Sequence, residues 1–308
     1  MISLPKGVNL NQLIQFLRNI GLQSSALLRD FENQSTSLYD SLENFHHDKK
    51  NNDPVTIADL ALNKLILEKF ANKYPNTDWD IITEENSKII AFEKPKSDWI
   101  WSIDPLDGTK DFIQRTGEYA VHVALIFKGN PILSMVLLPR LKEIWFGVLG
   151  IGTWKEGEES VLENKEINLE KLEKKELKPS MQREITKVVT SKNHNNPKLE
   201  LILNEMNFQN VIRMGSIGFK VCSLLRKEAE IYISISGKTS PKDWDLAAPD
   251  ALMKSAKCNF TYVNEDEITY GKKNYEQKGC LIASTLYKSE HVNVCRQINL
   301  IIKKYNLL

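Results

Sequence analysis

The sequence of 308 residues predicts an α+β fold in its first half and an α/β fold in its second half. Apolar residues recur at three- and four-residue steps through the first forty residues and again over residues 57–70, which indicates two amphipathic helices. Short apolar runs between turn residues then predict a series of strands over residues 99–154. From residue 185 onward, strand and helix patterns alternate. Strands that follow helices are typical of α+β folds with an antiparallel sheet, and alternation is typical of α/β folds.

The predicted helices of the first half have clear boundaries in the sequence. The first follows the apolar stripe from Leu10 to Phe31, and the second begins after the segment 53–56 and ends before Pro75. Asp59 lies in the first turn of the second helix, where the helix dipole favours an anion, so from the helix alone it is an ordinary first-turn acid. The predicted strands that follow cover residues 99–103, 119–127, 132–138, 144–148 and 152–154.

A charge-dense segment, residues 156–184, separates the two halves and is interpreted as a linker or surface excursion. It divides the chain into an N-terminal α+β subdomain, residues 1–155, and a C-terminal α/β subdomain, residues 185–308. The second subdomain has predicted strands at residues 185–190, 211–214, 229–236 and 280–284, and predicted helices at 197–206, 217–225, 246–256 and from about residue 290.

Composition excludes several classes of function. Lys and Arg total 41 and Asp and Glu total 40, so a formal net charge of +1 argues against a nucleic-acid polymer or an anionic membrane as partner. Apolar runs stay shorter than the ~20 residues that cross a bilayer. The first residues lack a secretory pattern and the four cysteines form no Cys-x-x-Cys pair, so we expect a cytoplasmic protein with reduced thiols.

The segment from Asp104 to Thr109 contains several candidate functional groups within six residues. Asp104 and Asp107 follow a predicted strand, and the Leu106 carbonyl between them offers a third oxygen. Oxygen ligands suit Mg²⁺, while Gly108 lets the backbone approach a phosphate and Thr109 supplies a hydroxyl that can position water. The segment does not fit the EF-hand pattern for calcium. On these six residues alone, a metal site and a surface turn remain equal alternatives.

Four motifs in order resolve this choice by resemblance. Together they are similar to the inositol monophosphatase superfamily in order and approximate spacing, from about residue 50 to residue 285. The stretch after Thr109, with Lys110-Asp111-Phe112 and Gly117-Glu118-Tyr119, most resembles the branch of CysQ-type 3'(2'),5'-bisphosphate nucleotidases. The four motifs are the segment 53–59, Thr83-Glu84-Glu85, the segment 104–109 and the segment 244–249.

The resemblance implies a fold, a site and a mechanism. The implied fold is a layered αβαβα sandwich, and the implied reaction is hydrolysis of a phosphate monoester by a water activated by two or three Mg²⁺ ions, with Li⁺ as an inhibitor. Asp59 and Thr109 match the pair that activates this water, with Glu84 linked to them. Glu85 matches an acid that either lies behind the metal ligands or binds a further, weaker ion. The implied metal ligands are Glu84, Asp104, the Leu106 carbonyl, Asp107 and Asp245.

Resemblance also implies substrate contacts, with one departure. The family's nucleotidases often carry an arginine on the strand at residues 230–234, where this chain has Ser234. Lys238 and Lys242 in the next loop are candidates to supply that charge. A lysine offers a point charge rather than a bidentate fork. The implied substrate-binding residues are Gly108, Lys110, His194, Gly215, Ser216, Lys220 and Lys238.

Three hypotheses for function follow. The first is conversion of adenosine 3',5'-bisphosphate to AMP and phosphate, as in sulfur metabolism, and the second is hydrolysis of an inositol or sugar monophosphate. The third is an inactive binding or regulatory protein, against which the complete acidic set argues. The partner is a small phosphorylated molecule, and both a monomer and a homodimer are compatible with the sequence.

Overall fold

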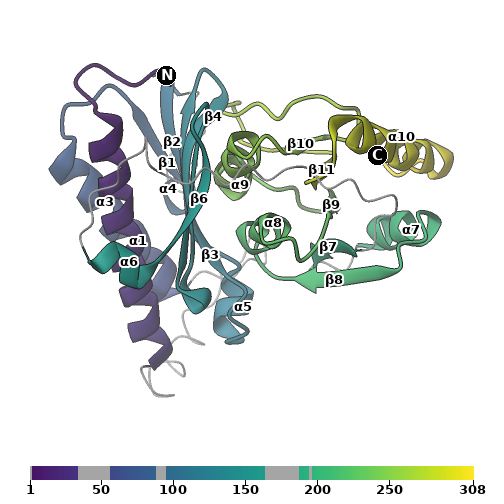
Figure 1. Cartoon of the computed structure of the whole chain (residues 1–308), viewed down its shortest axis with the longest axis horizontal. Coiled ribbons are helices and arrows are strands. Elements are labelled where there is room, and N and C mark those ends of the chain that lie inside the picture. Colours follow the sequence, from purple (N-terminus) through teal and green to yellow (C-terminus); the bar gives the residue numbers. More distant parts are fainter. Residues whose placement is uncertain (1, 34–55, 88–94, 164–186, 194–195) are drawn as a thin grey trace.

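A computed structural model of the chain describes residues 2–33, 56–87, 95–163, 187–193 and 196–308. Two β-sheets alternate with three layers of helices in these residues, as Figure 1 shows. The layered αβαβα sandwich predicted from the resemblance is therefore confirmed.

The first helical layer covers one face of the larger sheet (Figure 1). It consists of α1 (Leu10–Asn33), α3 (Ile57–Lys73) and α6 (Glu158–Leu162). Helix α3 begins at Ile57 because the Thr56 hydroxyl accepts hydrogen bonds from the first-turn amides of Ala58 and Asp59. Both helices predicted in the first half are present, although residues 53–55 of the preceding motif lie outside the described residues.

The larger sheet has six strands in sequence order, β1-β2-β3-β4-β5-β6. Strand β1 runs parallel to β2 and the other pairs are antiparallel, so the sheet is mixed rather than antiparallel throughout as predicted. The pairing of β2 with β3 is irregular between Asp104 and Asp107, and β2 continues to Asp107, past its predicted end. The strands are β1 (Asp80–Thr83), β2 (Trp99–Asp107), β3 (Ala120–Phe127), β4 (Asn130–Leu138), β5 (Glu143–Val148) and β6 (Gly152–Gly157).

Short helices connect these strands near one end of the sheet. Helix α4 (Glu84–Ser87) follows β1, α5 (Thr109–Ile113) follows β2, and a 3-10 turn (Pro139–Leu141) follows β4. The sequence pattern did not predict β1, α4 or α5, because each is too short to establish a period.

The middle layer consists of α8 (Ile217–Leu225) and α9 (Asp243–Ser255), which lie between the two sheets in Figure 1. Helix α9 packs against β3, β4 and β5 of the larger sheet and also contacts α8 and β10. It begins at Asp243, three residues before the predicted range 246–256, and Asp245 lies in its first turn.

The smaller sheet has five strands in the order β10-β11-β9-β7-β8, and two helices cover its outer face (Figure 1). Strands β9, β7 and β8 are parallel, as the α/β pattern predicts, whereas β11 pairs antiparallel with both β9 and β10. Strand β10 is an addition to the predicted elements. The elements are β7 (Lys187–Ser191), β8 (Asn210–Met214), β9 (Ile231–Ile235), β10 (Asn259–Tyr262), β11 (Cys280–Ser284), α7 (Pro197–Glu205) and α10 (Lys288–Tyr305).

Three hydrophobic clusters fill the spaces between the layers. Strand β3 shows how they are separated, because Val121, Val123 and Leu125 face the first helical layer while Ala120 and Ala124 face the middle layer. Both faces of the larger sheet are therefore buried. The subdomain boundaries near residues 155 and 185 stay predictions; within the predicted linker, residues 158–162 form α6 and residues 164–184 lie outside the described residues.

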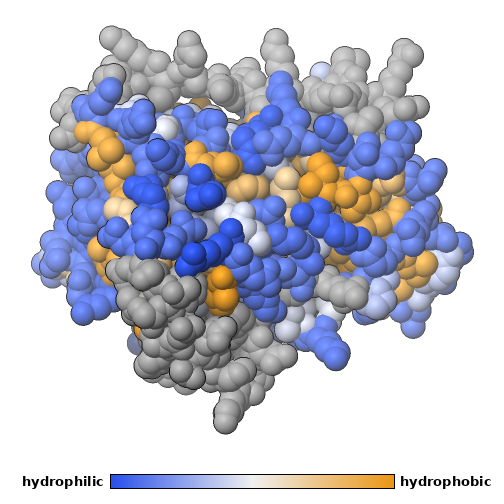
Figure 2. Space-filling view, turned by 90° about the horizontal axis from the view of Figure 1, so that it is seen from below, coloured by the Kyte–Doolittle hydropathy of each residue, from blue (hydrophilic) through white to orange (hydrophobic). Residues whose placement is uncertain are grey.

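The helices and the surface of the described residues can be compared with those of membrane proteins. None of the helices in the described ranges is both long and apolar enough to cross a bilayer. Hydrophilic residues predominate on the face seen in Figure 2, with hydrophobic areas between them. Large exposed apolar side chains come from separate elements, such as Leu60 in α3 and Leu300 in α10. All four cysteines are free and buried.

Candidate functional site

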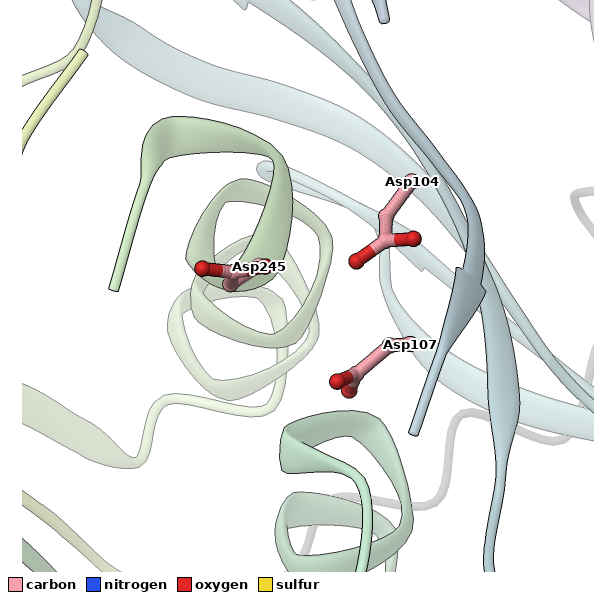
Figure 3. Close-up of side chains that lie close together, drawn as sticks. All are labelled: Asp104, Asp107 and Asp245. Carbon is pink, nitrogen blue, oxygen red and sulfur yellow. The ribbon is translucent and has the colours of Figure 1, made fainter. Parts of the chain in front are cut away.

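Three carboxylates from distant parts of the sequence meet between β2 and α9. Asp104, Asp107 and Asp245 each offer one oxygen, and these oxygens lie within 4.8 Å of one another. Figure 3 shows Asp104 and Asp107 projecting from β2 towards the first turn of α9, where Asp245 lies. Asp104 is buried and the other two are half-buried. The larger sheet and the middle helical layer thus build the cluster together.

Backbone amides orient the two carboxylates of β2. Asp104 Oδ1 accepts a hydrogen bond from the Leu106 amide at 3.0 Å. Asp107 Oδ2 accepts from the amides of Ile217 at 2.6 Å and Gly218 at 3.2 Å, at the start of α8. Helix N-termini favour anions, so α8 stabilises the charge of Asp107. One oxygen of each carboxylate is therefore held by the backbone.

Backbone amides also hold one carboxylate oxygen at the start of α9 and at the start of α3. Asp245 Oδ2 accepts from the Lys242 amide at 2.6 Å, and Asp59 Oδ2 accepts from the Thr56 amide at 2.8 Å. Both are third residues of their helices, so each returns one oxygen to the residue before the helix. The first-turn position that made Asp59 seem ordinary is also the one that fixes its direction.

Like charges surround Asp104. Burial raises its pKa well above the ordinary value, and the nearby carboxylates of Glu84, Asp107 and Asp245 raise it further. Oxygen donors at this density match what a hard divalent cation such as Mg²⁺ requires, since such an ion offsets the repulsion between them. The residues present therefore fit a magnesium site.

Asp59, Thr109 and Leu106 form a second part of the site. The Thr109 hydroxyl lies 3.1 Å from Asp59 Oδ1 and 3.1 Å from the Leu106 carbonyl oxygen, and its proton can go to either. Asp59 is only 2% exposed, and burial raises its pKa to about 6 against the hydrogen bonds from Thr56 that lower it. A carboxyl group with this pKa can accept a proton near neutral pH.

Glu84 and Glu85 open α4, directly after β1. Glu84 acts on the pKa of Asp104 and Glu85 on that of Asp59, so the two adjacent acids influence different parts of the site. Glu85 is buried, with 6% of its surface exposed. The structure thus brings both members of this motif close to the residues predicted as their partners.

Two glycines allow the loops around the cluster to approach closely. Gly108 has φ +92°, in the left-handed region that a side chain disfavours. A side chain at Gly215 would overlap the Asp111 carboxylate and the Glu118 carbonyl oxygen. Ser216 then begins α8, and its hydroxyl accepts the Phe219 amide at 2.9 Å.

The cationic residues predicted to contact substrate are dispersed. Lys220 is buried and donates to the Gly215 carbonyl oxygen, and burial lowers its pKa to about 8. Lys110 is half-buried in α5, and Lys238 is exposed before α9. His194 lies outside the described residues. Lys242, the alternative for the missing arginine, lies 2.9 Å from Glu276.

His122 adjoins the cluster, although the sequence analysis gave it no role. Its Nε2 lies 3.4 Å from Asp107 Oδ2, its Nδ1 lies 3.4 Å from the Trp244 carbonyl oxygen, and it is fully buried. Burial lowers its pKa and Asp107 opposes this effect. In the sequence, His122 could have been singled out as the one histidine within the apolar run of β3. A side chain at Gly218 would collide with this ring.

Sequence comparison identifies the family. The model of the inositol monophosphatase family matches residues 10–303, and the chain belongs to that family. The 3'(2'),5'-bisphosphate nucleotidase CysQ of Salmonella typhimurium is 32% identical over 251 residues, which are 80% of this chain and 87% of that protein. CysQ of Escherichia coli K12 is 30% identical over 250 residues, with the same coverage.

Solved structures share the fold. The crystal structure of CysQ from Bacteroides thetaiotaomicron, a bacterial member of the inositol monophosphatase family, matches with a TM-score of 0.69 at 22% identity, covering 90% of this chain and 98% of that one. The IMPase of Thermotoga maritima matches with a TM-score of 0.71 at 18% identity, covering 95% and 99%. The chain is a phosphatase of this family, CysQ-like in sequence, with an acidic cluster suited to a metal.

Proposed function

We propose that this chain hydrolyses the 3'-phosphate of adenosine 3',5'-bisphosphate to yield AMP and phosphate. The observation that carries the proposal is the meeting of Asp104, Asp107 and Asp245, in a chain about 30% identical to CysQ nucleotidases over 80% of its length. A phosphate monoester resists water because its negative oxygens repel a weak nucleophile. An acidic cluster that holds cations beside the phosphate removes that obstacle.

Glu84, Asp104, the Leu106 carbonyl, Asp107 and Asp245 are the proposed ligands for two or three Mg²⁺ ions. Bound Mg²⁺ supplies charge neutralisation and lowers the pKa of water. Carboxylates held by backbone amides meet such ions without first having to reorient. Li⁺ is the expected inhibitor, through competition for one of these positions.

Asp59 and Thr109 are the proposed route for the proton. The oxygen of a water molecule bonds to phosphorus while the bond from phosphorus to the 3' oxygen breaks, and solvent protonates the departing 3' oxygen. The water's proton passes to Thr109, whose hydroxyl is 3.1 Å from Asp59 and can donate its own proton to that carboxylate. Glu84 orients the same water from the opposite side, by this proposal. Thus no covalent phosphoenzyme forms.

The leaving group is recognised, in this proposal, by residues at the edge of the cluster. Gly108, Gly215 and Ser216 are the proposed contacts to a phosphate. The Ser216 hydroxyl, which accepts the Phe219 amide, can donate its proton to that phosphate, whereas the Gly215 and Ser216 amides donate to Glu118. The proposed cationic and imidazole contacts to the nucleotide are Lys110, His194, Lys220 and Lys238.

An inositol or sugar monophosphate is the second candidate substrate, and Ser234 favours it. This half-buried serine on β9 stands where an arginine would hold a second phosphate, and the charge of Lys242 is shared with Glu276 at 2.9 Å. A substrate with one phosphate needs no such charge. The third hypothesis, an inactive binding protein, requires that the acidic cluster serve no catalysis.

Phosphate release with Mg²⁺ decides between these candidates. We expect kcat/KM to be higher for adenosine 3',5'-bisphosphate than for inositol 1-phosphate, added Li⁺ but not Na⁺ to inhibit, and Asp107→Asn to be folded and inactive. Faster turnover of inositol 1-phosphate would overturn the nucleotide assignment. No release from any monoester would instead support the inactive protein. The cytoplasmic location and the choice between monomer and homodimer stay predictions.

A further inference from the structure

One lysine ties the two sheets together beside the acidic cluster. Lys192 follows β7 of the smaller sheet, and its ammonium lies 2.8 Å from Asp111 Oδ1 and 2.7 Å from Glu118 Oε2. Both acids belong to the connection between β2 and β3 of the larger sheet. Asp111 is fully buried and also accepts hydrogen bonds from Thr116 at 2.6 Å and from Asn193. We call Lys192, Asp111 and Glu118 the lysine clamp.

The clamp reaches the start of α8 through Glu118. The same oxygen that faces Lys192, Glu118 Oε2, accepts the Gly215 amide at 3.0 Å, and the Glu118 carbonyl oxygen accepts the Ser216 amide at 2.9 Å. Gly215 packs so closely on Asp111 and Glu118 that a side chain there would overlap both. Any movement of the clamp must therefore move the loop that begins α8.

The start of α8 in turn holds Asp107. The amides of Ile217 and Gly218, directly after this loop, donate to Asp107 Oδ2 at 2.6 Å and 3.2 Å. A continuous chain of contacts thus runs from the Lys192 ammonium through Glu118, Gly215 and the first turn of α8 to a carboxylate of the metal cluster.

We infer that Lys192 is a positioning residue: through Glu118 and the start of α8, it fixes Asp107 in the direction needed for metal binding. The inference rests on the proposed metal-dependent function. Carboxylates and amides that orient a ligand change metal affinity by roughly 10- to 100-fold when they are lost. Lys192 acts one contact further away, so its expected effect lies at the lower end of this range.

Electrostatics alone predicts the opposite result. Removing a positive charge beside a cluster of carboxylates leaves a more negative site, which should bind a cation more tightly. Loss of positioning should weaken binding instead. The direction of the change in metal affinity therefore separates the two roles.

Lys155 provides a matched control. Its ammonium lies 2.7 Å from Glu143 Oε1 and its side chain is 34% exposed, compared with 31% for Lys192, but it lies on β6 away from the cluster. Lys155→Met and Lys192→Met thus remove the same charge from side chains of similar exposure, although Lys192 bridges two carboxylates and Lys155 pairs with one. Lys192→Arg keeps the charge and can still bridge two carboxylates.

The experiment measures Mn²⁺ binding by titration calorimetry in wild type and the three variants, together with thermal unfolding. We expect Lys192→Met to raise the Mn²⁺ dissociation constant about tenfold, with Lys192→Arg and Lys155→Met within about twofold of wild type. If Lys192→Met does not fold, Glu118→Gln is measured instead. It keeps an oxygen for the Gly215 amide but gives Lys192 no charge, and weaker binding is again expected.

Three outcomes overturn the inference: unchanged or tighter Mn²⁺ binding in Lys192→Met, equal weakening in Lys155→Met, or failure of Lys192→Arg to retain binding. Parallel phosphate-release assays keep the two proposals apart. If wild type releases no phosphate from any monoester, the proposed function fails. The calorimetric comparison of the variants still tests the positioning of Asp107.

Discussion

Two of the three aspartates of helix α9, Asp245 and Asp250, lie in very different surroundings. Asp245, in the first turn, offers an oxygen within 4.8 Å of oxygens from Asp104 and Asp107. Asp250, further along the same helix, is fully buried with its Oδ2 3.0 Å from the Lys254 ammonium and 3.0 Å from the Tyr270 hydroxyl. One carboxylate joins a group of like charges, whereas the other is part of a closed ion pair.

The difference teaches what distinguishes a metal site from a structural acid. Burial alone does not, because Asp250 is more deeply buried than Asp245. Asp250 lies beside a cation of the protein, Lys254, while the cluster around Asp245 gathers negative charge that a bound cation would offset. Loss of Asp245 should therefore affect function, and loss of Asp250 should affect only stability.

The largest effect is expected from Asp245→Asn. Its kcat with Mg²⁺ should fall by at least about a thousandfold, roughly 4 kcal/mol of activation free energy, because the variant loses one of the proposed ligands of the ions. Phosphate release under saturating substrate measures it, with circular dichroism to verify folding. Asp250→Asn is the matched control and should keep kcat within about threefold. Equal loss in both variants would break the comparison.

The acidic set was predicted from the resemblance of its motifs to a family, whereas the contacts that hold these acids were not predicted. Asp59, Glu84, Asp104, Asp107 and Asp245 occur in short ordered motifs, and the structure brings their carboxylates into one region. Long periodic helices and alternating strands were also predictable, because their apolar patterns repeat. These features depend on residues close together in the chain.

What the sequence could not predict depends on contacts between distant segments. The bond from Asp107 to the Ile217 amide joins residues 110 positions apart, and the contact of His122 with the Trp244 carbonyl oxygen joins residues 122 positions apart. Lys192 was only one residue of a loop motif until folding placed it beside Glu118. No periodicity within one segment reports such a pairing.

A smaller effect, on stability, concerns Asp250 and pH. Burial raises the pKa of Asp250 from 3.8 to about 6, although Lys254 lowers it. Between these values the native state keeps a proton that the unfolded chain has lost, so this carboxyl group makes the free energy of unfolding fall as pH rises from about 4 to about 6. Asn cannot titrate. We therefore compare the free energies of unfolding of Asp250→Asn and wild type. The value for Asp250→Asn minus the value for wild type should increase by about 3 kcal/mol as pH rises from about 4 to about 6.

Urea denaturation at intervals from pH 4 to pH 7, with metal chelated, measures this difference. Above about pH 6 it should level off, because Asp250 is then ionised in both states. If the free energies of unfolding of wild type and Asp250→Asn vary with pH in parallel, the ion pair with Lys254 offsets the cost of burying the Asp250 carboxylate. Asp250 would then differ even more from Asp245, which lies among like charges.

The smallest effect is the stabilisation by Mg²⁺, which should be kept when Asp250 is replaced and lost when Asp245 is replaced. An ion that binds only the native state at ten times its dissociation constant adds about 1.4 kcal/mol, which raises the melting temperature by a few degrees. Wild type and Asp250→Asn should both show this rise, and Asp245→Asn should not.

Without metal, Asp245→Asn should melt above wild type, because one of the like charges that raise the pKa of Asp104 is gone. Adding Mg²⁺ should reverse that order, since only the intact cluster gains the ion. Thermal scans with and without Mg²⁺, at matched ionic strength with Na⁺, measure both halves of this reversal. If Mg²⁺ stabilises Asp245→Asn as much as wild type, the ion binds elsewhere, and the like charges around Asp104 need another explanation.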